Sequence, residues 1–389
     1  MSEWKKVKFL DVVSLNPRVS LEKGAVYPFV EMSNAVPGAR KPEKDVYQKY
    51  SGGGAKFEEG DTVVARIEPC LQNGKGFQCS YKKGFGSTEF LVFRPLNLKE
   101  MDCDYLYYYM GQQSIREAMA KTMVGASGRQ RVNNAVFNDL QINLPPLKIQ
   151  QEIASILSRY DSLIENYRKQ IKLLEEAAQR LYKEWFVELR FPGHENTKMV
   201  DGLPEGWERK PVDSIYSIKY GKNLSTKLIS ESGDFPVYGA NGVIGYYDKA
   251  NCNEQVVLIT SRGNGSGDVL MTYHKEAFIT NNSFIVSPLE DYSYCQLPFT
   301  YQFLRNANFR AVRTGAAQPQ LTNQSIHTVD VVLPTKGPIT AYCEKVSHCN
   351  EMIIRLKNQI RLLTEARDRL LPRLMGGEMD VKNNIRERK

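Results

Sequence analysis

The segment QIKLLEEAAQRL, residues 170–181, returns as QIRLLTEARDRL at residues 359–370. Most positions of the two copies are identical, and their offset of 189 residues is almost half of the 389-residue chain. A second pair supports the first, because residues 124–133 (VGASGRQRVN) resemble residues 314–323 (TGAAQPQLTN) once a one-residue shift is allowed. Two copies of one unit are therefore predicted, each a globule followed by a helix.

The repeated segments belong to two long helices with an apolar heptad seam. The first seam contains Ile153, Leu157, Tyr160, Ile164, Tyr167, Ile171, Leu174, Ala178, Leu181 and Trp185, and the second contains Tyr342, Val346, Cys349, Ile353, Leu356, Ile360, Leu363, Arg367 and Leu370. Only Arg367 interrupts the apolar pattern. Each helix is therefore predicted to pack along one continuous stripe.

The two seams are expected to pair with each other, because a lone helix would leave its apolar stripe in water. The globule between the helices should have its ends close together, so the second helix should begin near the end of the first. We therefore predict an antiparallel coiled coil about 48 Å long, with a pseudo-two-fold axis at its middle and one globule at each end. The alternative is a zipper that only joins chains into a dimer.

Each globule is predicted to mix short strands with one or two helices, which makes the fold class α+β. In the first globule, strands are expected at 61–67, 89–95 and 140–145 and a helix at 105–122; in the second, strands at 254–260, 268–273, 283–288 and 329–334 and a helix at 297–309. Glycine-rich segments separate these elements. They indicate curved sheets with long loops.

The composition is that of a globular protein, with 42% hydrophobic and 25% charged residues, and the length predicts two or more domains. No apolar run is long enough to span a membrane, and the N-terminus has no apolar signal segment. The seven cysteines form no CxxC pair, which favours reduced thiols and a cytoplasmic location. With four histidines, no metal site is expected.

The net charge of +8 permits an anionic partner. Residues 1–149 carry 21 Lys and Arg against 16 Asp and Glu, a balance of +5, whereas residues 191–335 carry 12 against 14, a balance of −2. Charge alone is therefore only a weak argument for nucleic-acid binding.

No catalytic constellation can be identified. The GNGSG of residues 263–267 lies between two expected strands rather than between a strand and a helix, so a hairpin loop is favoured over a nucleotide site. The sequence has no phosphate-binding G-x-x-x-x-G-K-[ST] motif and no Asn/Asp-Pro-Pro-aromatic motif of amino-methyltransferases. The chain is therefore predicted to be a reader rather than a catalyst.

The repeated loop carries side chains that can hydrogen-bond base edges. The candidate DNA contacts are Arg129, Gln130, Arg131 and Asn133 in the first copy and Gln318, Gln320 and Asn323 in the second, with Lys75, Arg262 and Asn264 on glycine-rich loops as candidate phosphate contacts. Solvated loop residues without a ligand are the alternative. The second loop has Pro319 where the first has basic residues, so the two loops need not do the same job.

The chain resembles the specificity subunit of Type I restriction–modification systems over essentially its whole length. The resemblance rests on LPPLKIQQEIASIL, QRLYKEWFVELRFPG, VDGLPEGWE, TGAAQPQLT and LLPRLMGGEMDV, together with the internal repeat. It implies two target recognition domains, 1–148 and 191–335, that each read one half of a split double-stranded DNA target. It also implies two conserved spacer helices, in 149–190 and 336–389.

The same resemblance implies partners and cofactors. The helices would dock two methyltransferase subunits that use S-adenosylmethionine to methylate adenine, and restriction subunits would add an ATP- and Mg²⁺-dependent nuclease. This chain would bind no cofactor itself. The alternatives are a coiled-coil scaffold that joins two protein partners and a single-chain methylase-nuclease. The missing methylase motifs disfavour the second of these.

Overall fold

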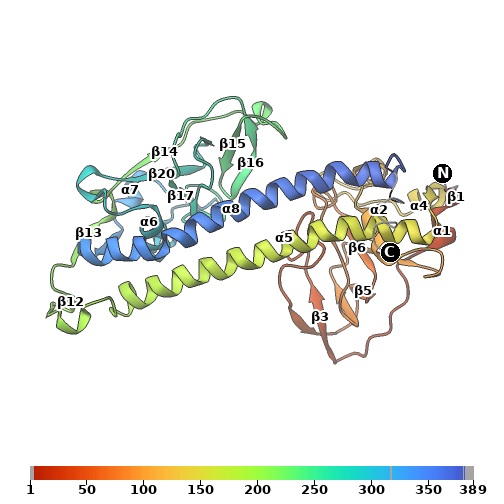
Figure 1. Ribbon diagram of the computed structural model, residues 1–389, viewed down its shortest axis with the longest axis horizontal. Coiled ribbons are helices and arrows are strands. Elements are labelled where there is room, and N and C mark those ends of the chain that lie inside the picture. Colours follow the sequence, from red (N-terminus) through yellow and green to blue (C-terminus); the bar gives the residue numbers. More distant parts are fainter. Residues whose placement is uncertain (1–3, 316–317, 380, 382–389) are drawn as a thin grey trace. The chain divides into compact units, whose positions relative to one another are not determined.

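The computed structural model describes residues 4–315, 318–379 and 381 (Figure 1). The chain divides into two compact units: residues 1–167 with 359–389 form unit 1, and residues 168–358 form unit 2. Each unit combines one globule with half of each long helix. None of the helices in the described part of the chain combines the length and apolar character needed to cross a membrane.

The two long helices are α5 (Leu147–Tyr182) and α8 (Lys336–Met375). In unit 1 the first half of α5 packs with the last part of α8, and in unit 2 the end of α5 packs with the beginning of α8. The two helices are therefore antiparallel within each unit, as the seams predict. A π-helical turn, Lys183–Val187, follows α5 and still places Trp185 in the interior.

The globule of unit 1 is built from short strands and helices. The strands are β1 (Lys5–Lys8), β2 (Val13–Leu15), β3 (Val26–Val30), β4 (Tyr47–Lys49), β5 (Ala55–Glu58), β6 (Thr62–Ala65), β7 (Gly76–Gln78), β8 (Lys83–Gly86), β9 (Phe90–Pro95) and β10 (Gln141–Leu144); the helices are α1 (Phe9–Val12), α2 (Cys103–Met110), α3 (Gln113–Ala120) and α4 (Val136–Asp139). They form two four-stranded sheets, in the orders β2-β9-β6-β7 and β4-β3-β8-β5, and the pair β1-β10.

The globule of unit 2 follows the same plan. The strands are β11 (Met199–Val200), β12 (Leu203–Pro204), β13 (Glu208–Pro211), β14 (Tyr216–Tyr220), β15 (Phe235–Gly239), β16 (Gly242–Tyr247), β17 (Val257–Thr260), β18 (Val269–Met271), β19 (Phe278–Ile279), β20 (Ser283–Pro288) and β21 (Asp330–Leu333); the helices are α6 (Leu297–Asn306) and α7 (Asn323–Ile326), with 3₁₀ turns at His194–Asn196, Val212–Ser214, Thr226–Leu228, Glu290–Tyr292 and Phe309–Val312. The sheets are β14-β20-β17-β18 and β16-β15-β19, with the pairs β13-β21 and β11-β12.

The duplication holds at the level of strand register. Lys5 pairs with Leu144 in unit 1 and Glu208 pairs with Leu333 in unit 2, at corresponding ends of β1-β10 and β13-β21. In both units one strand pair of the second sheet is parallel, β3 with β8 and β15 with β19. Strand β5 has no counterpart among the described strands of unit 2.

One expected helix is divided in two. Residues 105–122 were predicted as one helix, but α2 ends at Met110 and α3 begins at Gln113. Gly111 lies between them. Glycine has a low helix propensity, and the two short helices turn different apolar faces toward the same core, with Tyr105 and Leu106 from α2 and Met119 from α3 fully buried.

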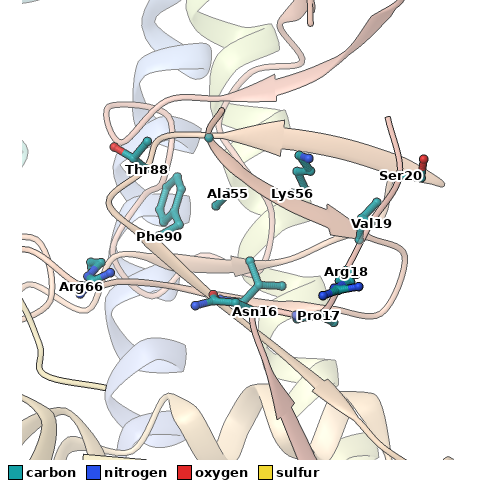
Figure 2. A pocket seen from close by; sticks show the side chains of 12 residues that line it. Asn16, Pro17, Arg18, Val19, Ser20, Ala55, Lys56, Arg66, Thr88 and Phe90 are labelled. Atoms are coloured by element: carbon teal, nitrogen blue, oxygen red, sulfur yellow. The ribbon is translucent and has the colours of Figure 1, made fainter. Parts of the chain in front are cut away.

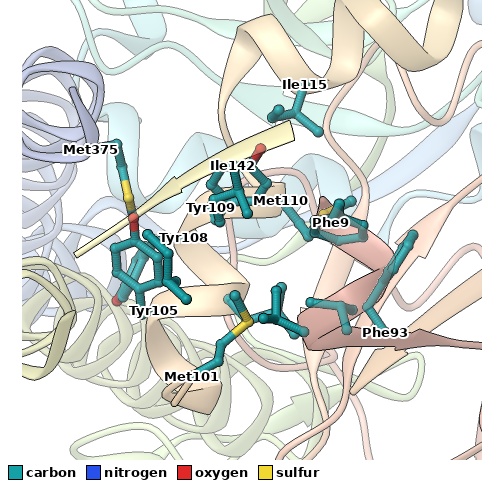
Figure 3. Close-up of a cluster of buried hydrophobic side chains, with 14 of the residues drawn as sticks. Phe9, Phe93, Met101, Tyr105, Tyr108, Tyr109, Met110, Ile115, Ile142 and Met375 are labelled. Atoms are coloured by element: carbon teal, nitrogen blue, oxygen red, sulfur yellow. The ribbon is translucent and has the colours of Figure 1, made fainter. Parts of the chain in front are cut away.

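The core of unit 1 contains side chains from the end of α8. Leu374 and Met375 join a buried cluster that includes Phe9, Phe93 and Tyr105 (Figure 3). Helix α8 ends at a glycine pair, and Gly377 has a φ of +72°, a conformation that favours glycine at a helix C-terminus. The side chain of Trp4 lies against this glycine, so the beginning and the end of the described chain meet in unit 1.

The core of unit 2 contains the end of α5 in the same way. Tyr182 and Trp185 are buried together with Tyr342 of α8 and Phe299 of α6, and the Tyr342 hydroxyl donates to the Ala178 carbonyl at 2.9 Å. Trp207, which corresponds to Trp4, packs on aromatic rings that follow α5. All the predicted seam residues are buried or half-buried.

Arg367, the polar interruption in the seam, is held inside unit 1. Its Nη1 donates to Asp161 Oδ1 at 2.6 Å and to the Gly38 carbonyl at 2.9 Å, and the Tyr108 hydroxyl donates to Asp161 Oδ2 at 2.5 Å. Burial and the Asp161 charge raise the pKa of Tyr108, so the phenol keeps its proton and remains a donor. The side chains of Arg367 and Asp161 are only 11% and 7% exposed.

We predict that Arg367→Ala lowers the free energy of unfolding by about 3 kcal/mol, because the substitution leaves the Asp161 carboxylate buried without its cation. Urea unfolding of the full chain, followed by circular dichroism, measures the change. Arg369→Ala is the matched control, because Arg369 is an exposed arginine on the same helix, and the expected loss is below about 0.5 kcal/mol. Equal losses in the two variants would contradict a structural role of the ion pair.

Candidate nucleic-acid interface

Two loops come together at the same place in each unit. The first, called here the linker loop, joins two antiparallel strands: residues 66–75 join β6 to β7, and residues 261–268 join β17 to β18. The second, called here the glycine hairpin, is residues 124–131 in unit 1 and, among the described residues, 314–315 and 318–320 in unit 2. The glycine hairpins are the repeated loop of the sequence, and they contain several of the candidate DNA contacts.

In unit 1 backbone hydrogen bonds join the linker loop to the glycine hairpin. The hairpin closes on itself where Val124 and Arg131 exchange two bonds of 3.0 Å. Across the loops, the Glu68 amide donates to the Gln130 carbonyl at 3.0 Å, and the Val132 amide donates to the Arg66 carbonyl at 2.9 Å. Backbone hydrogen bonds therefore fix the position of the hairpin against the linker loop.

Unit 2 repeats these bonds at corresponding positions. Thr314 and Gln320 exchange two bonds of 2.9 Å. The Gly263 amide donates to the Pro319 carbonyl at 3.0 Å, and the Leu321 amide donates to the Ser261 carbonyl at 2.8 Å. Four backbone bonds kept through the duplication show that both hairpins are presented by one backbone design.

Glycine is required at one corresponding position of both hairpins. Gly125 has a φ of +123° and Gly315 a φ of +85°, a region that side-chain-bearing residues rarely adopt. A Cβ on Gly315 would also lie 2.6 Å from the Gln318 carbonyl oxygen. The turn that carries Gln318 and Gln320 therefore depends on this glycine.

The candidates of unit 1 differ in how they are engaged. Arg129 is exposed and Gln130 is half-buried, whereas Arg131 donates three hydrogen bonds of 2.7–3.0 Å to Glu89, and this carboxylate raises the pKa of the guanidinium. The Asn133 side chain accepts from the Ala135 amide at the start of α4. Lys75 Nζ donates to the Met32 carbonyl at 2.9 Å. Arg129 is thus the candidate of unit 1 most open to a ligand, whereas the Gln130 Nε2 donates to the Gly125 carbonyl at 3.4 Å.

The candidates of unit 2 are all exposed. Arg262 and Asn264 lie in the linker loop, Gln318 and Gln320 in the glycine hairpin, and Asn323 at the first residue of α7. Arg262 and Gln320 form an antiparallel β-bridge, so these two candidates from distant segments stand side by side. The contact roles of all ten candidates remain predictions.

Two arginines beside the linker loop of unit 2 were missed in the sequence. Arg310 Nε donates to Asp268 at 2.9 Å, and Arg313 Nη1 donates to the Asn264 carbonyl at 3.4 Å. Arg310 lies in the 3₁₀ turn Phe309–Val312 and Arg313 directly follows it. Their partners lie more than 40 positions earlier, and no local sequence pattern connects the two segments. Their roles are to brace the loop that carries Arg262 and Asn264.

The arrangement offers hydrogen-bonding groups and positive charge. Within the described residues, no three His, Cys, Asp or Glu side chains come together in a way that could hold a metal ion. Guanidinium and amide groups on a fixed backbone are the groups that bind nucleic-acid bases and phosphates.

Comparison with known families agrees with the internal repeat. Residues 1–176 and 204–362 match the family model described as "Type I restriction modification DNA specificity domain". The two matches correspond to the two copies of the repeat and together cover most of the chain.

Curated relatives carry the same description. The chain is 26% identical over 305 residues to the Type I restriction enzyme MjaIX specificity subunit of Methanocaldococcus jannaschii, which covers 72% of this chain and 69% of the relative. It is 23% identical over 333 residues to the MjaVIII specificity subunit of the same organism, which covers 78% and 76%.

A solved structure shares the fold. The S subunit of a Type I restriction–modification system from M. genitalium matches with a TM-score of 0.53 and 18% sequence identity, over 95% of this chain and 96% of that one. At this identity the similarity shows the fold alone.

We predict that Gly315→Ala destabilises the glycine hairpin of unit 2, because alanine is strained at this φ and its Cβ would meet the Gln318 carbonyl. Hydrogen exchange of the Gln320 amide, which is bonded to Thr314, should become roughly tenfold faster, equivalent to about 1.4 kcal/mol. Gly337→Ala is the control, because a Cβ there meets nothing within 4 Å, and it should leave this amide unchanged. Unaltered exchange in Gly315→Ala would show that the hairpin tolerates the strain.

Proposed function

Because the chain belongs to the family of Type I restriction modification DNA specificity domains, we propose that it reads a bipartite target on double-stranded DNA. Each globule reads one half-site through its glycine hairpin and linker loop. The observation that carries the proposal is the pair of equivalent hairpins. Equivalent backbone bonds hold them, but they carry different side chains. Arginine and glutamine are suited to guanine and adenine edges, respectively.

The paired helices α5 and α8 join the two recognition domains in this proposal. A single small domain contacts few base pairs, so it binds weakly. Joining two domains makes the second contact intramolecular and multiplies the affinity. The same connection makes the length of the spacer between the two half-sites part of what the protein recognises.

The proposal assigns the chemistry to partner subunits. Two methyltransferase subunits would dock on the helices and use S-adenosylmethionine to methylate adenine in the target. Restriction subunits would add ATP- and Mg²⁺-dependent cleavage. In this proposal the chain selects the target and contributes no catalytic group. Its linker loops and glycine hairpins carry side chains that can bind DNA, as this role requires.

Substitutions in one hairpin should change one half-site. Gln130→Ala is expected to relax base preference in the half-site read by unit 1, and Gln318→Ala in the half-site read by unit 2, each by about 1–3 kcal/mol of discrimination. Single-molecule sequencing of methylated DNA, in a host expressing the chain with its methyltransferase, measures both half-sites at once. Gln113→Ala, an exposed glutamine on α3, is the control. A change in both half-sites from either variant would refute independent reading.

Lengthening the helices should change the spacing between half-sites. One heptad inserted into α5 and one into α8 adds about 10 Å, or about three base pairs at 3.4 Å each. The methylated sequence of this variant should keep both half-sites and gain a longer spacer. An unchanged spacer would show that the helices do not set the distance.

A further inference from the structure

A basic cavity lies beside the glycine hairpin in unit 1. Its volume is about 600 Å³, and Figure 2 shows the side chains that line it. Three of them are cations, Arg18, Lys56 and Arg66, and none is an aspartate or glutamate. Arg18 follows β2, Lys56 lies on β5 and Arg66 begins the linker loop, so three separate segments contribute positive charge to one cavity.

Unit 2 has a basic cavity at the corresponding place. Its volume is about 360 Å³, and its lining includes Lys219 and Lys222 but no aspartate or glutamate. The correspondence follows from strand pairing. In unit 1 the Asn16 amide, at the end of β2, donates to the Val92 carbonyl on β9 at 2.7 Å. In unit 2 the equivalent pair is Lys219 on β14 and Ile285 on β20.

Each cavity is connected to its glycine hairpin by a side-chain hydrogen bond. Arg66 Nη2 donates to the Val132 carbonyl at 3.1 Å in unit 1, and the Tyr220 hydroxyl donates to the Leu321 carbonyl at 3.3 Å in unit 2. Val132 and Leu321 are equivalent residues, each directly after its hairpin. The duplication therefore preserves a contact between cavity and hairpin even though the donor residue differs.

The cations of both cavities lack acidic partners. Throughout the described part of the chain, no carboxylate forms an ion pair with Arg18, Lys56, Lys219 or Lys222. Lys56 Nζ lies 5.4 Å from the centroid of the Tyr50 ring. This neutral ring does not cancel the positive charge of the lysine. Arg66 Nε is buried and has no hydrogen-bond partner among the described residues. The cations Arg18, Lys56, Lys219 and Lys222 are therefore available to an external anion.

We propose that the two cavities bind backbone phosphates of duplex DNA, one on each half-site, next to the bases read by the hairpins. This inference rests on the proposed function. Phosphate oxygens accept the charge-assisted hydrogen bonds that guanidinium and ammonium groups donate, and two copies of the cavity match two contacts on one duplex. Phosphate contacts fix the position of a domain on DNA without selecting sequence, so these cations set the register of each hairpin.

The test compares two double variants in the complex purified with its methyltransferase subunits: Arg18→Gln with Lys56→Gln, and Lys219→Gln with Lys222→Gln. Binding is measured over a salt series on a duplex carrying the methylated target and on one lacking it. The slope of log affinity against log salt concentration should fall by about 2 in each variant, since each lost phosphate contact removes roughly 0.9. Affinity should fall equally on both duplexes, and the methylated sequence should stay the same.

The controls remove the same charge elsewhere: Lys99→Gln with Lys148→Gln in unit 1, and Lys198→Gln with Lys275→Gln in unit 2, all exposed lysines outside the cavities. A cavity variant with the same slope as its control overturns the phosphate assignment. A variant complex that loses a methyltransferase subunit while keeping the slope overturns it too, and assigns the cavity to an acidic protein surface. A wild-type complex that does not prefer its methylated sequence refutes the proposed function instead.

Discussion

The core of each unit closes only with the end of the helix that belongs to the other copy of the repeat. Leu374 and Met375 of α8 complete the core around Phe9 in unit 1, and Tyr182 and Trp185 complete the core of unit 2. Fully burying one such large apolar side chain stabilises a fold by about 1.5–3 kcal/mol. The antiparallel direction of the helices is therefore required by core closure as well as by the seam, because a globule with only its own helix would leave part of its core in water.

The two copies have diverged inside this shared design. Arg367 and Asp161 of unit 1 correspond to Ala178 and Asn350 of unit 2, at the offset of 189 residues. Ala178 and Asn350 instead line a small cavity of about 30 Å³ with Tyr301, enough for about one water molecule. Unit 1 uses the larger arginine to hold the carbonyl of Gly38, in a segment between β3 and β4. The same position of the repeat therefore holds an ion pair in unit 1 and borders a small cavity in unit 2.

The sequence predicted the features that depend on periodicity and repetition. The seams are regular over many turns, so the two helices and their antiparallel pairing could be derived before any coordinates. The break at Gly111 and the π-helical turn around Trp185 were not predicted, because tertiary packing decides them locally. The partner of Arg367 comes from residues more than 200 positions away, and each basic cavity gathers residues from several segments. No short pattern marks residues such as Arg18, Lys56 and Arg66 as neighbours, so the glycine hairpins were found and the cavities beside them were not.

In each hairpin the backbone positions the loop, and the side chains it carries differ between the two units. Their backbone bonds to the linker loop are the same in both units, so both loops are held against their sheets by the same backbone contacts. The side chains differ at equivalent positions: Arg131 stands where Gln320 stands, and Pro319 stands where unit 1 has Gln130, not a basic residue as the sequence predicted. Under the proposed function, the two half-sites therefore need not have the same sequence, although both are read by one design. Under the same proposal, substitutions at these positions would change base preference, while the backbone bonds that join each hairpin to its linker loop stay available.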